Sequence, residues 1–210
     1  MASIHFTQTA TRQHLHNVWS SPRLRYVKLD HTDAAHRAAM SRNWSNPASQ
    51  ATVNLSLVEP INQAGVENRM KMFGEIALLA VVICLPGEDD HSPGQIIGNI
   101  LLRPGMSKDL MVNRRGEIGI VIGDEFQRKG YGREAINWIM DWGFGQVGLH
   151  SIAVEAATYN EGALHLYKSI GFQEDGRARQ ARFFGDKWYD IVMMSMLEEE
   201  WRALRTAQME

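Results

Sequence analysis

Six consecutive residues carry the most distinctive chemistry in this chain. They lie between an apolar, strand-like run and a helix-like run, and they read Gln127-Arg128-Lys129-Gly130-Tyr131-Gly132. Glycines near a helix start let an anion approach the backbone, and the first helical N–H groups lack partners within the helix and point toward that anion. The helix dipole favours the same charge. The segment therefore predicts a site for a pyrophosphate.

A second polar segment follows further along the chain. It reads Asn160-Glu161-Gly162-Ala163-Leu164-His165-Leu166-Tyr167 and closes with Gly171-Phe172. Asn160 suits the N-cap of a helix over 161–169, and Gly171 suits the left-handed residue that follows such a helix. This segment could bring polar side chains to the same ligand.

The glycine segment also fits the dinucleotide-binding pattern G-x-G-x-x-G/A, with Glu155 as the acidic residue that this pattern expects. In a nucleotide-binding βαβ unit the first glycine directly follows the strand, whereas residues 123–129 separate Ile122 from Gly130 here. The preceding residues also lack a repeating βαβ rhythm. A nicotinamide-nucleotide enzyme therefore remains a weaker alternative, as does a glycine turn without a ligand.

Strands and helices must position these segments, and hydrophobic periodicity predicts both. Strands are expected over 24–29, 76–85, 95–102, 117–122 and 150–156, with a final hairpin turning at Gly185-Asp186. Helices are expected over 34–40, 61–73, 131–146, 161–169 and 198–208. Without a repeat or linker, residues 22–210 are predicted to form one α+β domain around a mixed sheet, and residues 1–21 a polar N-terminal arm.

Composition argues against several classes of protein. A formal net charge of −2 differs from the basic excess of nucleic-acid-binding domains. The longest apolar run, 76–86, is too short to cross a bilayer, so we expect no membrane partner. A single cysteine, Cys84, and no secretory signal indicate a cytoplasmic protein. The first 29 residues lack Asp and Glu and contain Arg, which leaves a mitochondrial transit peptide as the alternative.

The ordered combination of both segments resembles the GNAT superfamily of acetyl-CoA-dependent N-acetyltransferases. Gln127, Gly130 and Gly132 correspond to the family's Q/R-x-x-G-x-G/A motif. The second motif, N-x-x-A-x-x-L-Y-x-x-x-G-F, is matched without departure by Asn160, Ala163, Leu166, Tyr167, Gly171 and Phe172. The resemblance covers roughly 24–201. It is strongest to the branch of Rim-type ribosomal-protein N-terminal acetyltransferases, spermidine acetyltransferases and aminosugar acetyltransferases.

The resemblance implies a twisted, mostly antiparallel mixed sheet of six to seven strands flanked by helices, with acetyl-CoA as cosubstrate. The strand backbone at Ile120, Val121 and Ile122 would pair with the pantetheine arm. The amides from Arg128 to Gly132, including Lys129, Gly130 and Tyr131, would take the pyrophosphate. Arg128, Lys129 or Arg133 could reach the phosphates of the nucleotide end. Asn160 is implied to contact pantetheine, with Ala163 beside it.

Transfer of an acetyl group from a thioester to an amine requires a neutral amine, a stabilised oxyanion and a proton for the departing thiolate. Tyr167 matches the family's general acid. A strand amide near Val121 would stabilise the oxyanion. Glu117 is the first candidate for the base, although its spacing to Gln127 is one residue shorter than in the family's histone-acetylating branch. Glu155 is the second candidate, and a chain of water molecules is the third.

Direct transfer is favoured over an acetyl-cysteine intermediate, because Cys84 lies in an apolar run without an activating His. The eight histidines show no metal-ligand spacing, so no metal is predicted. The acceptor is a primary amine: a small-molecule amine, polyamine, aminosugar or protein N-terminus. A catalytically silent CoA-binding module is the alternative, and the chain could be a monomer or a homodimer. Candidate walls of the acceptor site are Trp44, Glu75, Phe184, Trp188, Tyr189 and Asp190.

Overall fold

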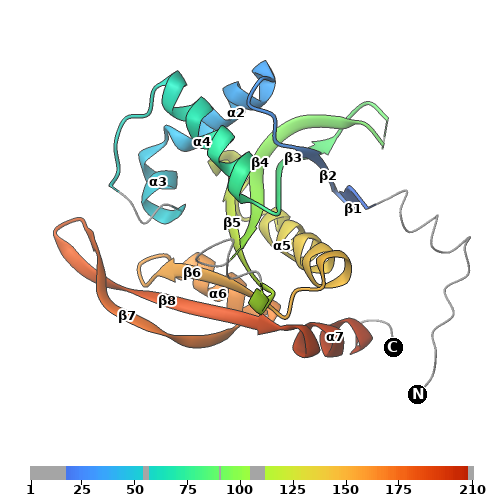
Figure 1. Ribbon diagram of the computed structural model, residues 1–210. Helices are drawn as coiled ribbons and strands as arrows, with labels where there is room; N and C mark the ends of the chain where they lie inside the picture. The colour runs from blue at the N-terminus through green and yellow to red at the C-terminus, as the bar shows by residue number, and fades with distance from the viewer. Residues whose placement is uncertain (1–17, 54–56, 90, 105–111, 208–210) are drawn as a thin grey trace, which may run out of the picture.

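The computed structural model describes residues 18–53, 57–89, 91–104 and 112–207. Its centre is one eight-stranded sheet in the order β1-β2-β3-β4-β5-β6-β8-β7 (Figure 1). The strands are β1 (Ser20–Ser21), β2 (Leu24–Lys28), β3 (Leu79–Pro86), β4 (Pro93–Pro104), β5 (Arg115–Ile122), β6 (Ser151–Ala157), β7 (Gln173–Phe184) and β8 (Lys187–Leu197). The predicted α+β fold is confirmed, with more strands than the six to seven expected.

One neighbouring pair of strands is parallel and the other pairs are antiparallel. The parallel pair is β5 and β6, which are joined through α5 (Tyr131–Trp142). Parallel neighbours require a crossover long enough to return to the starting edge of the sheet, and a helix supplies it. The glycine segment therefore lies in a single βαβ unit within a mostly antiparallel sheet, rather than in the repeated units of a dinucleotide-binding fold.

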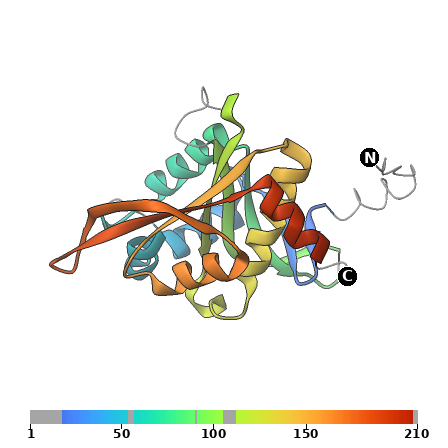
Figure 2. The same ribbon diagram turned by 90° about the horizontal axis from the view of Figure 1, so that it is seen from below.

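Helices cover both faces of the sheet, and two hydrophobic clusters follow from this. On one face α2 (Ala34–Trp44) and α4 (Gln63–Ile76) pack against the side chains that include Val82, Leu101 and Val121. On the other face α5 and α6 (Glu161–Ile170) pack against Ile100 and Ile118, among others. Figure 2 shows α4 and α6 on opposite sides of the sheet.

The remaining elements lie at the ends of the sheet. The short helix α3 (Pro47–Val53) contacts β5 and β6, and η2 (Asp124–Phe126) is a single 3₁₀ turn after β5. The π-helical turn η3 (Gly143–Val147) extends α5, and α7 (Glu198–Ala207) stacks Trp201 on Phe144 with ring centres 5.3 Å apart. The β7–β8 hairpin projects beyond the other strands (Figures 1 and 2).

Several boundaries differ from those predicted. Helix α4 continues to Ile76 and β3 begins at Leu79, so the first residue of the predicted strand 76–85 closes a helix and the next two connect it to β3. Helix α5 ends at Trp142, because the chain widens into η3. The predicted turn at Gly185-Asp186 is confirmed, with φ of 55° and 60° at the two residues. Of the predicted arm 1–21, Ser20 and Ser21 form β1, and residues 1–17 lie outside the described residues.

Candidate functional site

The site is built where β5 and β6 separate. Their parallel pairing covers Arg115 to Glu117 on β5 and ends at the pair Glu117 and Ala153, although β5 runs on to Ile122 and β6 to Ala157. Figure 1 shows the two strands diverging beyond that point. The far half of β5 still pairs with β4 on its other edge, from Ile118 to Ile122. An extended ligand can therefore add its own hydrogen bonds to the edge of β5 that β6 leaves.

The loop after β5 is held by its own side chains. The Gln127 amide donates to the Ile122 carbonyl at 2.9 Å and to Asp124 Oδ1 at 3.0 Å, so this predicted ligand residue braces the turn around η2. Two residues adopt left-handed conformations, Arg128 at φ 59° and Gly130 at φ 84°. A glycine suits the second position because it lacks the Cβ that makes such φ values costly.

Helix α5 begins at the end of this loop with its amides available. Its first backbone hydrogen bond runs from the Glu134 N–H to the Gly130 carbonyl at 3.2 Å. The N–H groups of Tyr131, Gly132 and Arg133 precede this bond and belong to the turn whose donors have no intrahelical acceptor. The loop and helix start thus present N–H groups of the kind that bind anions, and the pyrophosphate site stays a prediction.

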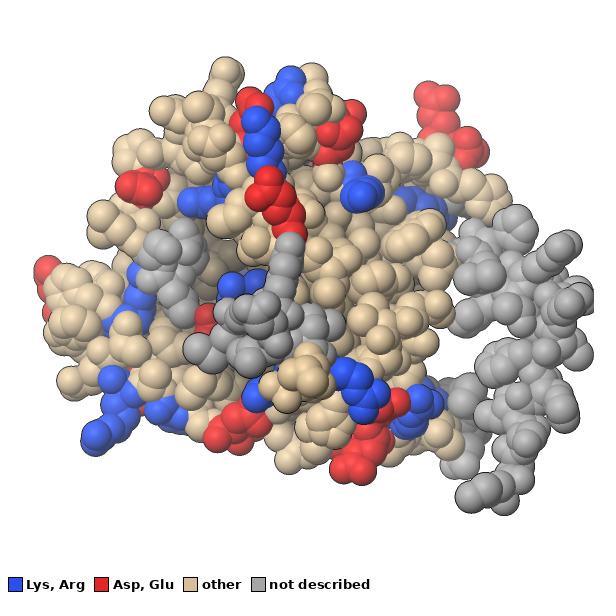
Figure 3. Space-filling model, viewed as in Figure 1, with Lys and Arg blue, Asp and Glu red and all other residues tan. Residues whose placement is uncertain are grey.

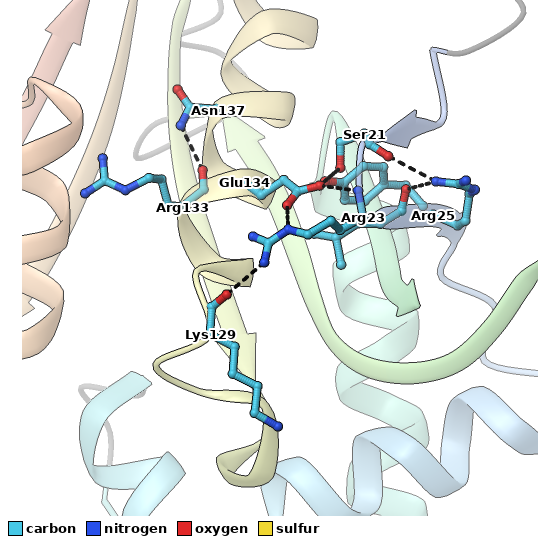
Figure 4. A network of polar contacts seen from close by, with 9 residues as sticks. Ser21, Arg23, Arg25, Lys129, Arg133, Glu134 and Asn137 are labelled. Carbon is cyan, nitrogen blue, oxygen red and sulfur yellow. Dashed lines mark hydrogen bonds and ion pairs between the residues drawn. The ribbon is translucent and has the colours of Figure 1, made fainter. Parts of the chain in front are cut away.

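The basic side chains around the loop have different neighbours. The Arg133 guanidinium donates to the Ser169 carbonyl at 3.0 Å and also bonds its hydroxyl, so it joins α5 to α6. The Lys129 ammonium lies 5.5 Å from the centre of the Phe126 ring. Arg128 is exposed. An unanticipated residue, Arg23, reaches the loop from the turn between β1 and β2 (Figure 4).

Asn160 performs two structural tasks. Its Oδ1 accepts from the Ala163 N–H at 3.2 Å and caps α6, as predicted, while its Nδ2 donates to the Thr52 carbonyl of α3 at 3.1 Å. The adjacent Tyr159 hydroxyl donates to the Ala51 carbonyl of the same helix. Helix α3 is therefore tied to the end of β6, beside the opening between the strands.

Tyr167 comes to this opening from the α5 side of the sheet. Its side chain is 8% exposed and belongs to the hydrophobic cluster on that side. Burial, and to a smaller extent the Glu155 carboxylate, raises the pKa of Tyr167 to about 12. The phenol is therefore protonated at neutral pH and can act as a donor.

Two carboxylates approach from the opposite face. Glu155 alternates along β6 with Val154 and Ala156, which point into the α5-side cluster, so Glu155 points to the other face. Glu117 pairs with Ala153, two residues before Glu155, and so shares this face. The charge of Glu155 influences the pKa of Tyr167, and the charge of Glu117 influences the pKa of Glu155, so Glu155 lies within electrostatic range of both residues.

The two carboxylates differ in their partners. Glu117 forms an ion pair with Arg103 of β4, its cross-strand neighbour. Glu155 is exposed, yet its surroundings remove enough hydration to raise its pKa; the Glu117 charge raises this pKa further and Arg103 opposes the shift. The structure thus gives Glu155 a raised pKa and gives Glu117 an ion-pair partner.

The candidate acceptor residues divide into separate groups. Trp44 is 5% exposed, packs on Phe73 and donates to Asn99 at 3.3 Å, so it belongs to the core and not to a ligand wall. This part of the sequence prediction is wrong, because the indole of Trp44 at the end of α2 is buried against Phe73 of α4. Glu75 is exposed on α4.

The hairpin residues also separate. Trp188 is paired with Phe183, and its neighbour Tyr189 points to the opposite face of β8. Phe184 and Tyr189 gather around Tyr159, with ring centres 5.1 and 4.9 Å from it. Asp190 accepts from the Gln180 N–H at 2.9 Å. Figure 3 shows a hollow between the α3 and α4 region and the hairpin, with acidic and basic side chains inside it.

Cys84 lies in the cluster formed with α2 and α4, with 2% exposure, and burial raises its pKa to about 11. A buried, protonated thiol is a poor nucleophile, which supports direct transfer over an acetyl-cysteine intermediate. Among the described residues, no group of three or more His, Cys, Asp and Glu is placed to hold a metal ion. Within the same residues, no helix is long and apolar enough to cross a membrane.

Sequence reasoning missed three residues of this site: Arg103, Tyr159 and Arg23. Arg103 lies near the end of β4 and Glu117 near the start of β5, a pattern that brings opposite charges together across an antiparallel pair. Tyr159 directly precedes the Asn160 cap, and this adjacency was its available signal. Arg23 carries no local signal of its contact with the loop, because its partner Glu134 lies 111 residues away in the chain.

Comparison with known proteins agrees with this geometry. A family model described as an acetyltransferase (GNAT) domain matches residues 5–173, and the chain belongs to this family. A spermidine N(1)-acetyltransferase of Vibrio cholerae is 33% identical over 90 residues, 43% of this chain and 52% of that protein. A putative ribosomal N-acetyltransferase of Bacillus subtilis is 36% identical over 90 residues, 43% of this chain and 49% of that protein. The matches thus span about half the length of these curated relatives.

The fold also has solved counterparts. The crystal structure of a spermidine N-acetyltransferase from Vibrio cholerae in complex with CoA and spermine superimposes with a TM-score of 0.72 at 22% identity, over 87% of this chain and 99% of that one. A GNAT-family acetyltransferase from Bacillus anthracis gives a TM-score of 0.69 at 20% identity, over 86% and 98%. At these identities the likeness establishes a shared fold.

Proposed function

We propose that this protein is an acetyl-CoA-dependent N-acetyltransferase that moves the acetyl group directly to a primary amine. The observation that carries the proposal is the end of the β5–β6 pairing at Glu117 and Ala153, with an anion-binding helix start beyond β5 and Tyr167 beside the opening. Membership of the GNAT family and the named relatives support the same activity.

The donor would lie along the outer half of β5. Its pantetheine arm would bond the backbone of Ile120, Val121 and Ile122, and its pyrophosphate would meet the amides before Glu134. The opening between the strands would then hold the thioester. A backbone N–H near Val121 is well placed to stabilise the oxyanion, because a fixed donor needs no reorganisation during the reaction.

Acetyl transfer proceeds by attack of the amine nitrogen on the thioester carbonyl, which gives a tetrahedral oxyanion. When this species collapses, the C–S bond breaks and the CoA sulfur takes a proton. We assign this proton to the Tyr167 hydroxyl, which burial keeps protonated. The amide product and free CoA then leave, and Tyr167 regains a proton from solvent or from the proton released by the amine.

An amine that arrives as an ammonium ion must lose a proton before it attacks. Glu155 is our choice for this acceptor, directly or through water, because loss of hydration raises its pKa toward the working pH of a general base. Glu117, the first candidate from the sequence, has its carboxylate engaged by Arg103. We assign to the Glu117–Arg103 ion pair the role of adjusting the pKa of Glu155, which the Glu117 charge raises and the Arg103 charge lowers.

The acceptor class follows from the same face. Carboxylates and the aromatic rings of Tyr159, Phe184 and Tyr189 suit a cationic amine. Polyamines, aminosugars, small amines and protein N-termini all satisfy this description, and the relatives include a spermidine acetyltransferase and a putative ribosomal acetyltransferase. We place the protein in this Rim-like branch, acting as a monomer or homodimer in the cytoplasm without a metal.

The test is incubation of the protein with acetyl-CoA and a mixed panel of polyamines, aminosugars and peptides, followed by mass spectrometry of the products and measurement of free CoA. Acetylated amine in proportion to released CoA supports the proposal. Tight CoA binding without release across the panel would favour a catalytically silent CoA-binding module.

A further inference from the structure

Arg23 joins the turn between β1 and β2 to the start of α5 and to the loop before it. Its Nε donates to Glu134 Oε2 at 2.8 Å and its backbone N–H donates to Glu134 Oε1 at 2.7 Å. Its Nη1 donates to the Lys129 carbonyl at 3.0 Å, and the guanidinium lies 4.9 Å from the centre of the Tyr131 ring. Figure 4 shows Arg23 extending between the start of α5 and the loop.

The other end of the ion pair is fixed as well. The Glu134 side chain is only 12% exposed, and Oε1 also accepts from the Ser21 hydroxyl at 2.7 Å. A carboxylate with three donors has little freedom, so Arg23 is attached to a rigid point on α5. The Arg23 side chain is itself 51% exposed, so the attachment depends on the fixed geometry of Glu134 and not on burial of both charges.

The bond to Lys129 orients a particular peptide group. In a trans peptide unit the C=O and N–H point in opposite directions. When the Lys129 carbonyl points at Arg23, the Gly130 N–H therefore points away from Arg23. Lys129 lies between the two left-handed residues, Arg128 and Gly130, where the backbone would otherwise relax. Arg23 thus holds the loop in one orientation before a ligand arrives.

The same contact changes the electrostatics of the helix start. Glu134 lies in the first turn of α5, where a carboxylate suits the helix dipole but repels a bound anion. The Arg23 guanidinium offsets this negative charge. The Glu134 carboxylate would then repel an anion bound at the N–H groups of Tyr131 and Gly132 less strongly.

We propose that Arg23 is a positioning residue for the pyrophosphate of the acyl donor: it holds the Lys129–Gly130 peptide in a receptive orientation and neutralises Glu134. The inference rests on the proposed function, since it assigns a role to the same donor site. It extends that site to the turn between β1 and β2, which lies on the other side of α5 from the second motif.

The experiment compares Arg23→Met with a matched control that removes a different ion pair to the same helix, α5. Arg205 of α7 forms an ion pair with Asp141 at the far end of α5, with a distance of 2.7 Å from Nε to Oδ1. Arg205→Met removes this ion pair. Calorimetry measures the Kd for CoA, and steady-state rates are measured with acetyl-CoA and with acetyl-pantetheine, which lacks the pyrophosphate. Thermal unfolding of each free variant reports general stability.

With Arg23→Met we expect the Kd for CoA and the KM for acetyl-CoA to rise about tenfold, while kcat at saturation stays within about twofold, because the lost contacts serve ground-state binding. Rates with acetyl-pantetheine should match the wild type, and Arg205→Met should leave CoA binding unchanged. Arg23→Lys keeps the charge without the fork, so a rise in Kd of about threefold is expected.

Unchanged CoA affinity in Arg23→Met would overturn the inference while leaving the proposed function intact. An equal loss of rate with acetyl-pantetheine would also overturn it, since the effect would then not involve the pyrophosphate. If Arg23→Met fails to fold, the lysine variant decides: wild-type affinity for CoA contradicts the positioning role. A wild-type protein that binds no CoA would refute both the proposed function and this inference.

Discussion

Tyr167 and Glu155 approach the opening between β5 and β6 from opposite faces of the sheet, and the charge of Glu155 contributes to the raised pKa of the Tyr167 phenol. Under the proposed function, this relationship would place a proton donor on one side of the thioester and a proton acceptor on the other. The two proton transfers would then occur at separate groups.

Replacement of Tyr167 by Phe should lower kcat about 100-fold, because the departing thiolate loses its proton donor. The change removes one hydroxyl from a buried ring, so the Kd for CoA should stay within about twofold of the wild type. Assays of CoA release with an amine that the wild type acetylates measure kcat, and calorimetry measures the Kd for CoA. Wild-type kcat in this variant would remove Tyr167 from the role of acid.

Replacement of Glu155 by Gln should lower kcat/KM for the amine at neutral pH and weaken its dependence on pH. In the wild type, the rate should increase as pH rises through the raised pKa of Glu155, because the carboxylate must be free to take a proton. Ionisation of Tyr167 should not reduce the rate below about pH 11, given its pKa of about 12. A pH profile of both proteins is the measurement. An unchanged profile in Glu155→Gln would assign the proton to Glu117 or to water.

The same variant should be at least as stable as the wild type at neutral pH. The folded state raises the pKa of Glu155, so over the pH range between its unfolded and folded pKa values the folded protein binds more protons than the unfolded chain. Stability from this group therefore falls as pH rises through that range, and the neutral amide removes the penalty. Denaturant unfolding at acidic and neutral pH tests this, and a clear loss of stability at neutral pH would contradict it.

Replacement of Gly130 by Ala should weaken CoA binding, because a Cβ at φ 84° costs about 1 kcal/mol and would lie near the guanidinium of Arg23. A Cβ at this position would be 3.1 Å from Arg23 Nη2. Gly132→Ala is the matched control: its Cβ would have ordinary contacts, the nearest at 3.6 Å from Leu166. Calorimetry should give a higher Kd for the first variant only; equal values for both would show that the left-handed turn is not required.

Asn160 offers a way to separate its cap from its bond to α3. Asn160→Ala should destabilise the protein by about 1 kcal/mol through loss of the cap. Asn160→Asp keeps an oxygen for the Ala163 N–H but removes the donor to Thr52, so it should retain most of the stability. Chemical denaturation of the three proteins distinguishes these contributions. Equal losses in both variants would show that the Thr52 bond dominates.

Much of the donor site was accessible from local sequence. The left-handed turn at Gly130, the start of α5 and the Asn160 cap of α6 depend on residue types within a few positions of each other. Alternating apolar residues such as Ile118 and Ile120 placed β5 beside the core, since every second side chain of a strand faces the same side. These features are set by steric limits on the backbone and by short-range hydrogen bonds.

The sequence by itself determined where the left-handed glycine turn, the start of α5 and the capped helix that carries Tyr167 lie. Only the tertiary structure decided that Arg103 engages Glu117, that Trp44 is buried, and that Arg23 and Glu134 hold the loop together. Those contacts join residues far apart in the chain, and they form where strand register and helix packing bring charges and rings together. Local residue patterns do not predict this strand register, because it depends on how all the strands of the sheet pair.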